Sequence, residues 1–153
     1  MILCCGEALI DFMPFRDSEA QTAYRSCPGG SPLNTAVALG RLGTSVGFLS
    51  GISQDLFGNL LVSHLEESGV NCSLLCRVDH DTTLAFVSAK SAAGEVEYAF
   101  YAKETADRSL KLTDLPSCLP ESVRALQFGS VSLVMEPTAS TLEALMLRES
   151  PHR

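Results

Sequence analysis

A short segment, Gly29-Gly30-Ser31-Pro32, joins extended sequence to a helical pattern and constrains the fold more than any other feature. The two glycines permit backbone shapes that other residues resist, so residues 27–30 are expected to form a loop. Ser31 can cap a helix, and Pro32 suits its first position, where no amide hydrogen is needed. A loop is therefore expected to lead directly into a helix, with free backbone amides facing any ligand held there.

Strands and helices alternate around this loop. Residues 2–5 are apolar and precede a glycine, which predicts a strand buried on both faces. Helical spacing of apolar residues follows from 33 to 40, with Gly43 as a stop, and again from 57 to 65 after Asp55, a candidate cap. The remaining predicted elements are strands at 9–15, 46–50 and 123–128, and a helix opened by Pro137 with Leu142, Leu145 and Met146 inward. This alternation predicts an α/β fold with a mainly parallel sheet and flanking helices.

The segment from residue 83 to residue 101 has a different pattern. Two β-rich runs, 83–89 and 96–101, are separated by Ala92-Ala93-Gly94, which predicts a hairpin. A hairpin inserted in an α/β chain often stands off the main sheet as a flap. Three aromatic residues lie on it and could simply pack the flap: Tyr98, Phe100 and Tyr101.

Composition and charge exclude several classes of protein. Hydrophobic residues make up 46% and charged residues 19% of the 153 positions, so one folded domain with a core is expected. The net charge of -7, with 11 scattered lysines and arginines, argues against nucleic-acid binding. Every apolar run is shorter than a membrane span, and the start of the sequence lacks the basic segment of a secretory signal. No membrane partner is expected.

Metal and nucleotide motifs are also missing from the sequence. The six cysteines include no C-x2-C pair and the three histidines stand apart, so no metal site is expected. The cysteines are instead expected to be reduced thiols in the cytoplasm. Neither G-x-G-x-x-G after the first strand nor G-x4-G-K-[ST] occurs, which counts against a dinucleotide-binding domain and a P-loop enzyme.

Two polar side chains lie where a ligand could contact the loop. Asn34, on the first helical turn, offers a donor and an acceptor to the space in front of Gly29 and Gly30. Asp11 follows the first strand, and α/β proteins bind ligands at the carboxyl ends of strands. Its carboxylate could accept two hydrogen bonds from neighbouring sugar hydroxyls, or be a solvated group at a strand end. The glycine loop itself suits a polyhydroxylated or anionic ligand, although many loops with two glycines simply form a turn.

Together these segments resemble the PfkB/ribokinase family of carbohydrate kinases. The N-terminal signature of that family has two small residues, a short gap, an asparagine and a small residue, with glycines at set distances afterwards. The positions that fit it in order are Gly29, Gly30, Pro32, Asn34, Ala36 and Gly43. At the position of the last glycine of the signature, this chain has Ser53. Residues 6–11, Gly-Glu-Ala-Leu-Ile-Asp, are similar to the opening of bacterial fructokinases and ketodeoxygluconate kinases.

The region after the hairpin is similar to the fructokinase-type end of the lid in this family. Residues 98–101 read Tyr-Ala-Phe-Tyr, and residues 105–108 read Thr-Ala-Asp-Arg. Many relatives carry arginine directly after the aromatic pair, whereas this chain has Ala102. The difference favours fructose or a similar neutral sugar over an acidic one.

The resemblance implies a ribokinase-like (Rossmann-like) fold with a small β-hairpin lid, whose strands cover about 8–26 and 83–101. Residues 1–153 would form the N-terminal part of the kinase domain, with an incomplete sheet and without the C-terminal ATP-binding half. The implied reaction of the parent enzyme is ATP-dependent phosphorylation of a sugar hydroxyl, with Mg²⁺. The residues implied to bind the sugar are Asp11, Gly29, Gly30, Asn34, Phe86, Tyr98 and Tyr101.

The family's catalytic aspartate lies in a C-terminal G-A-G-D motif, which does not occur here. No catalytic residue is therefore expected in this chain, ATP and Mg²⁺ are not expected to bind it tightly, and the chain alone is expected to be inactive. Two alternatives stay open: a non-catalytic sugar-binding or dimerisation module from a truncated gene, and a different α/β nucleotide-binding domain. Relatives often pair through their lids, so a homodimer through the lid is expected.

Overall fold

A three-stranded parallel sheet forms the centre of the computed structural model, which describes residues 1–89 and 94–151. The strand order is β4-β1-β9, so the apolar strand β1 lies between two parallel neighbours and is buried, as its sequence predicts. On its outer side, β9 pairs with no strand of the described residues. The bounds are Ile2–Cys5 for β1, Val46–Leu49 for β4 and Ala125–Phe128 for β9.

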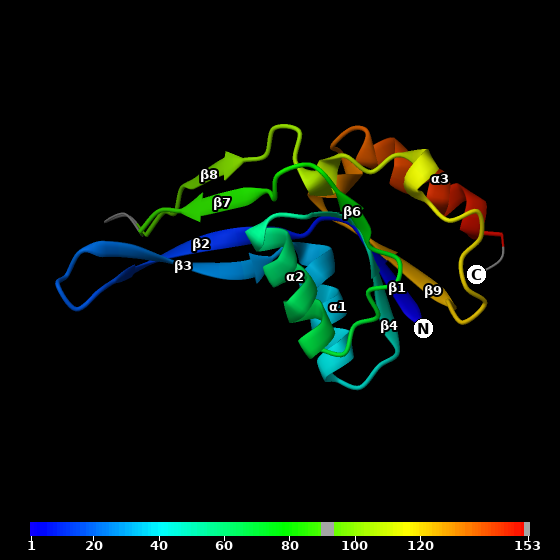
Figure 1. Cartoon of the computed structure of the whole chain (residues 1–153), viewed down its shortest axis with the longest axis horizontal. Helices are drawn as coiled ribbons and strands as arrows, with labels where there is room; N and C mark the ends of the chain where they lie inside the picture. Colours follow the sequence, from blue (N-terminus) through cyan, green and yellow to red (C-terminus); the bar gives the residue numbers. More distant parts are fainter. Residues whose placement is uncertain (90–93, 152–153) are drawn as a thin grey trace.

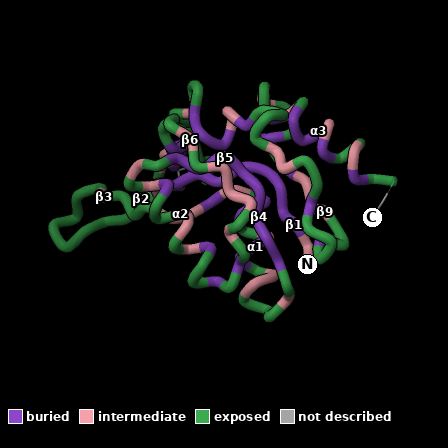
Figure 2. Tube along the Cα trace, turned by 45° about the vertical axis from the view of Figure 1, so that its right-hand side comes forward, coloured by how far each residue is buried: buried purple, intermediate pink, exposed green. Residues whose placement is uncertain are grey.

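Helices cover both faces of this sheet, which confirms the predicted α/β class (Figure 1). The helices are α1 (Ser31–Arg41), α2 (Leu56–Glu67) and α3 (Thr138–Glu149). Successive residues of β1 point to opposite faces. Cys4 packs into a core with Leu33 of α1 and Leu65 of α2, whereas Leu3 packs into a second core with Leu142 of α3. Burial accordingly concentrates along β1 and β4 (Figure 2).

A second sheet of four strands extends away from the central sheet, at the left of Figure 1. Its order is β3-β2-β7-β8, in which β2 and β7 are parallel and the two outer pairs are antiparallel. We call it the outer sheet. The predicted pairing of the two β-rich runs after residue 83 is confirmed, although residues 92 and 93 of the predicted turn lie outside the described residues. The bounds are Leu9–Arg16 for β2, Thr22–Gly29 for β3, Leu84–Val87 for β7 and Tyr98–Tyr101 for β8.

The expected loop at residues 27–30 is mostly strand, so that prediction is wrong. β3 continues to Gly29 because it pairs with β2 along its whole length, from Thr22 opposite Arg16 to Gly29 opposite Leu9. Pro28 is tolerated because β3 lies at an edge of the outer sheet, where the missing amide hydrogen is not needed on the free side. Only Gly30 is left to make the turn into α1.

The ends of the first two helices follow their local signals with one exception. Gly30, and not Ser31, is the cap of α1, and Ser31 is already helical. Gly43 follows α1 with a φ of 77°, as expected for a glycine stop. Asp55 caps α2 as predicted, since its Oδ1 accepts a hydrogen bond from the Gly58 amide at 2.7 Å.

The Asp55 carboxylate also joins α2 to the segment before β7. It accepts hydrogen bonds from the Thr82 amide at 2.9 Å and from the Thr82 hydroxyl at 2.7 Å. Burial alone would raise the pKa of Asp55, but these hydrogen bonds and that from Gly58 outweigh it and lower the pKa. Asp55 thereby attaches the outer sheet to α2.

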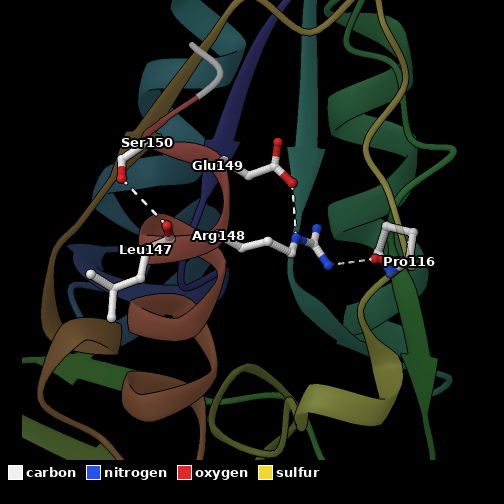
Figure 3. A network of polar contacts seen from close by, with 5 residues as sticks. All are labelled: Pro116, Leu147, Arg148, Glu149 and Ser150. Carbon is white, nitrogen blue, oxygen red and sulfur yellow. Dashed lines mark hydrogen bonds and ion pairs between the residues drawn. The ribbon is translucent and has the colours of Figure 1, made fainter.

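The last helix is held at its C-terminal end by a polar network (Figure 3). Arg148 donates to the Pro116 carbonyl at 2.8 Å and pairs with Glu149 at 2.9 Å. Leu142 is fully buried, but Met146, also predicted to face inward, is 39% exposed. Met146 lines an open groove of about 410 Å³ beside β9. No strand of the described residues covers this groove.

None of the helices in the described part of the chain has the length and apolarity needed to cross a bilayer. All six cysteines are free thiols, and burial raises the pKa of Cys4 to about 11, which makes it a packing group and not a reactive one. The other short elements are β5 (Gly51–Ser53), β6 (Cys76–Val78) and single 3₁₀ turns at Ala106–Arg108, Leu112–Asp114 and Val131–Leu133.

Candidate functional site

The turn from β3 into α1 lies directly beside Asp11 of β2. Asp11 pairs with Cys27 in the register of the two strands, two positions before Gly29. A Cβ atom placed on Gly29 would lie 2.2 Å from Oδ2 of Asp11. Because Gly29 has no side chain, the Asp11 carboxylate can occupy the space beside it. The structure thus brings these two predicted site residues together.

The Asp11 carboxylate is half-buried and has no hydrogen-bond or ion-pair partner among the described residues. Burial raises the pKa of Asp11, because leaving water disfavours the charged form. The Asp11 oxygens are not among the buried side-chain atoms that lack a partner, so they are accessible, and a carboxylate can accept several donors. The Asp11 carboxylate can therefore accept hydrogen bonds from a ligand, since no described residue donates to it.

Gly30 and Asn34 complete the turn. The Asn34 amide donates to the Gly30 carbonyl at 2.9 Å, which closes the first turn of α1. Asn34 is exposed, and no described residue is hydrogen-bonded to its side-chain amide. Asp11, Gly29, Gly30 and Asn34 thus belong to one continuous corner of the molecule, where β2, β3 and α1 meet.

The aromatic residues predicted for the site divide between the two faces of the outer sheet. Phe86 stacks on Phe12, with ring centroids 4.5 Å apart, and meets Tyr101 edge-on at 5.7 Å. Phe12 directly follows Asp11 in β2, so the side chains of Phe86 and Tyr101 lie on the face opposite to Asp11. The rings of Phe86 and Tyr101 therefore pack on the opposite face of the sheet and do not lie beside the Asp11 carboxylate.

Tyr98 lies on the same face as Asp11, together with a residue that the sequence analysis did not select. Ala85 pairs with Asp11 on one side and with Phe100 on the other, and cross-strand partners share a face. Phe100 therefore lies in the row of Asp11, and Tyr98 stacks beside it at 5.8 Å. Strict alternation from Tyr98 would have selected Phe100 and not Tyr101.

The described residues show no candidate metal centre, since no group of three or more His, Cys, Asp or Glu side chains converges among them. The site is instead a carboxylate, a glycine turn, an exposed amide and aromatic rings on one face. Carboxylate and amide groups beside aromatic rings suit a neutral polyhydroxylated ligand, because they provide directional hydrogen bonds next to apolar surface.

Solved structures with the same architecture are sugar kinases of the ribokinase-like fold. Fructokinase from Xylella fastidiosa with bound ATP superposes with a TM-score of 0.88 and 31% identity, covering 98% of this chain and 48% of that one. A double mutant of fructokinase from Vibrio cholerae O395, in a fructose-, ADP- and potassium-bound form, has a TM-score of 0.81 and 28% identity, with 98% and 46% covered. The fold is thus that of this class of enzymes.

Sequence comparison gives the family. Residues 1–148 match the profile of the pfkB family carbohydrate kinase, so the chain belongs to that family. A fructokinase from Rhizobium leguminosarum bv. trifolii is 42% identical over 153 residues, which are all of this chain and 46% of that protein. The chain therefore spans about half of the length of the relatives it matches.

Proposed function

We propose that this chain is the sugar-binding part of a fructokinase-like kinase whose whole enzyme transfers the γ-phosphoryl group of ATP to a sugar hydroxyl. The observation that carries the proposal is the half-buried Asp11 carboxylate beside Gly29, without a partner among the described residues. Two neighbouring hydroxyls of fructose or a similar neutral sugar can donate to its two oxygens. Asn34 and the Gly29-Gly30 turn would bind further hydroxyls from the α1 side.

In this proposal the outer sheet is a lid, with strands within about 8–26 and 83–101, that closes over the sugar. Tyr98 and Phe100 are 58% exposed on the face of Asp11, so they would cover the apolar face of the sugar ring. Phe86 and Tyr101 would keep the lid rigid through their ring contacts on the opposite face. Exclusion of water by such a lid favours transfer to the sugar over hydrolysis of ATP.

ATP and Mg²⁺ belong, in this proposal, to the whole enzyme. The 153 residues contain neither G-x4-G-K-[ST] nor G-A-G-D, so they do not fit a nucleoside triphosphate, and no step through the nucleotide is assigned to them. Residues 1–153 would be the N-terminal part of the kinase domain and would have no measurable kinase activity alone. The free cysteines fit a reducing compartment, so we place the enzyme in the cytoplasm.

We further propose that two lids pair to form a homodimer. Beyond Asp11 the same face of the outer sheet carries Met13 and Phe15, which are 44% and 42% exposed, and exposed Tyr98 on the other side of β7. Exposed apolar surface of this kind is typical of protein interfaces. Light scattering after size exclusion should show a dimer, and Phe15→Glu should convert it to a monomer without weakening sugar binding. A wild-type monomer at all concentrations tested would contradict the pairing.

Isothermal titration of the chain with fructose and, separately, with ATP and Mg²⁺ tests the proposed function. We expect saturable fructose binding with a dissociation constant roughly in the millimolar range, where enzyme substrates often lie, and no heat from ATP. Absence of binding to fructose and to other neutral sugars would refute the sugar-binding role of this chain. Tight ATP binding would refute the assignment of the nucleotide to the rest of the enzyme.

A further inference from the structure

Glu7 is a buried carboxylate that the proposed function leaves without a role. It lies two residues after β1 and is 2% exposed. Its oxygens accept hydrogen bonds from three serines: the Ser31 amide at 3.2 Å, the Ser130 amide and hydroxyl at 3.0 and 2.7 Å, and the Ser132 amide and hydroxyl at 3.3 and 2.8 Å. Apart from a bond from its own backbone amide, the carboxylate is therefore bonded to donors from other segments.

The first of these donors belongs to the turn of the candidate site. Ser31 is the first residue of α1, and the first amides of a helix have no partner inside it. The cap residue Gly30 has no side chain, and the first turn contains no acidic residue. Glu7 therefore provides from 24 residues away the acceptor and the negative charge that helices elsewhere obtain from a local cap.

The other donors belong to the segment that follows β9. Ser130 and Ser132 are 123 and 125 residues from Glu7 in the sequence. The carboxylate thus joins the end of β1, the segment after β9 and the start of α1. These three points surround the carboxyl edge of the central sheet, which is where α/β proteins place their ligands.

The backbone around Glu7 is packed too closely to shift freely. A Cβ atom on Gly30 would lie 2.6 Å from the Glu7 carbonyl oxygen, and one on Gly6 would lie 2.0 Å from the Gly129 carbonyl oxygen. A shift of the Glu7 backbone would therefore move the Gly30 turn as well, and with it Asn34, whose backbone amide is bonded to the Gly30 carbonyl.

We propose that Glu7 is a positioning residue of the sugar site, which holds the Gly29-Gly30 turn and Asn34 in binding geometry by fixing the start of α1 to the segment after β9. This role rests on the proposed function, because it concerns the same sugar site. An ionised carboxylate suits the role since it only accepts hydrogen bonds, and the groups of the three serines that contact it donate. Glutamine at this position would direct an NH₂ group toward at least one of those donors.

The test compares Glu7→Gln with Glu149→Gln, which changes a second buried carboxylate, 6% exposed, at the end of α3. Fructose affinity is measured by titration, and amide hydrogen exchange is followed at residues 29–34. We expect Glu7→Gln to weaken fructose binding by roughly 10-fold, the effect of a small misplacement of binding groups, and to speed exchange at 29–34. We expect Glu149→Gln to lower the thermal midpoint with both readouts unchanged.

Equal fructose affinity and unchanged exchange in folded Glu7→Gln would overturn the positioning role. If the wild type bound no sugar while Glu7→Gln still loosened residues 29–34, the proposed function would fail and the fixing of the turn by Glu7 would stand. Should Glu7→Gln fail to fold, Ser132→Ala removes one hydroxyl donor while the carboxylate remains. It should weaken fructose binding by about 3-fold, in line with one modest hydrogen bond, and wild-type affinity would overturn the proposal.

Discussion

Asp11→Asn is expected to weaken fructose binding by roughly 100-fold, because hydrogen bonds to a charged acceptor contribute about 1.5–3 kcal/mol each. The amide keeps the shape of the side chain but has one accepting atom where the carboxylate has two. Titration calorimetry of the wild type and the variant measures the change. Asp79→Asn, at an exposed position, is the matched control and should leave affinity unchanged.

The same substitution should not reduce stability. Burial raises the pKa of Asp11, so the folded chain holds this proton more tightly than the unfolded chain does. The ionised form therefore costs stability above the folded pKa, and the cost disappears as the pH falls below the unfolded pKa. Asp11→Asn should match or exceed the wild type in thermal midpoint at pH 7, while wild-type fructose affinity should fall as the pH drops through the raised pKa. Wild-type affinity in the variant would remove Asp11 from the site.

Gly30→Ala is expected to destabilise the chain by about 3 kcal/mol or more. Gly30 has a φ of 107°, a region nearly restricted to glycine, where other residues cost of order 1–3 kcal/mol. The added methyl group would also lie 2.6 Å from the Glu7 carbonyl oxygen, which is backbone and cannot rotate away. Urea unfolding of both proteins measures the loss.

Gly43→Ala separates the two contributions. Gly43 also has a positive φ, 77°, but a Cβ atom there meets nothing within 4 Å. Its loss should be about 1–2 kcal/mol, which is the cost of the left-handed conformation alone. If Gly30→Ala and Gly43→Ala lowered the free energy of unfolding by the same amount, the close approach of Gly30 to Glu7 would make no contribution to the cost.

Local signals predicted the parts of the fold whose causes lie within a few residues. The apolar run of β1, the Asp55 cap and the stop at Gly43 were recognisable because each depends on neighbouring residues only. The strand at residues 27–29 was missed because pairing with residues of β2 that lie 16 to 20 positions earlier overrides the turn preference of Pro28 and Gly29. That pairing is a tertiary interaction, which local sequence propensity does not predict.

The candidate site divides in the same way. Asp11, Gly29, Gly30 and Asn34 were selected by type and spacing, and the structure places them at one corner. Phe86 and Tyr101 lie on the other face because a one-residue difference in register reverses the direction of a side chain, and the aromatic run alone does not define the register. Glu7 could not be singled out, since its partners are 24, 123 and 125 residues away.

The position of β1 between β4 and β9 also sets the order in which the chain can fold on the ribosome. β4 begins at residue 46, soon after β1, but β9 begins only at residue 125. At about 5–20 residues per second, roughly 6–24 s of synthesis separate the central strand from its second neighbour. One edge of the central strand therefore lacks its partner throughout that interval. We expect the early β1-α1-β4 unit to reduce the chance that this edge pairs with another protein.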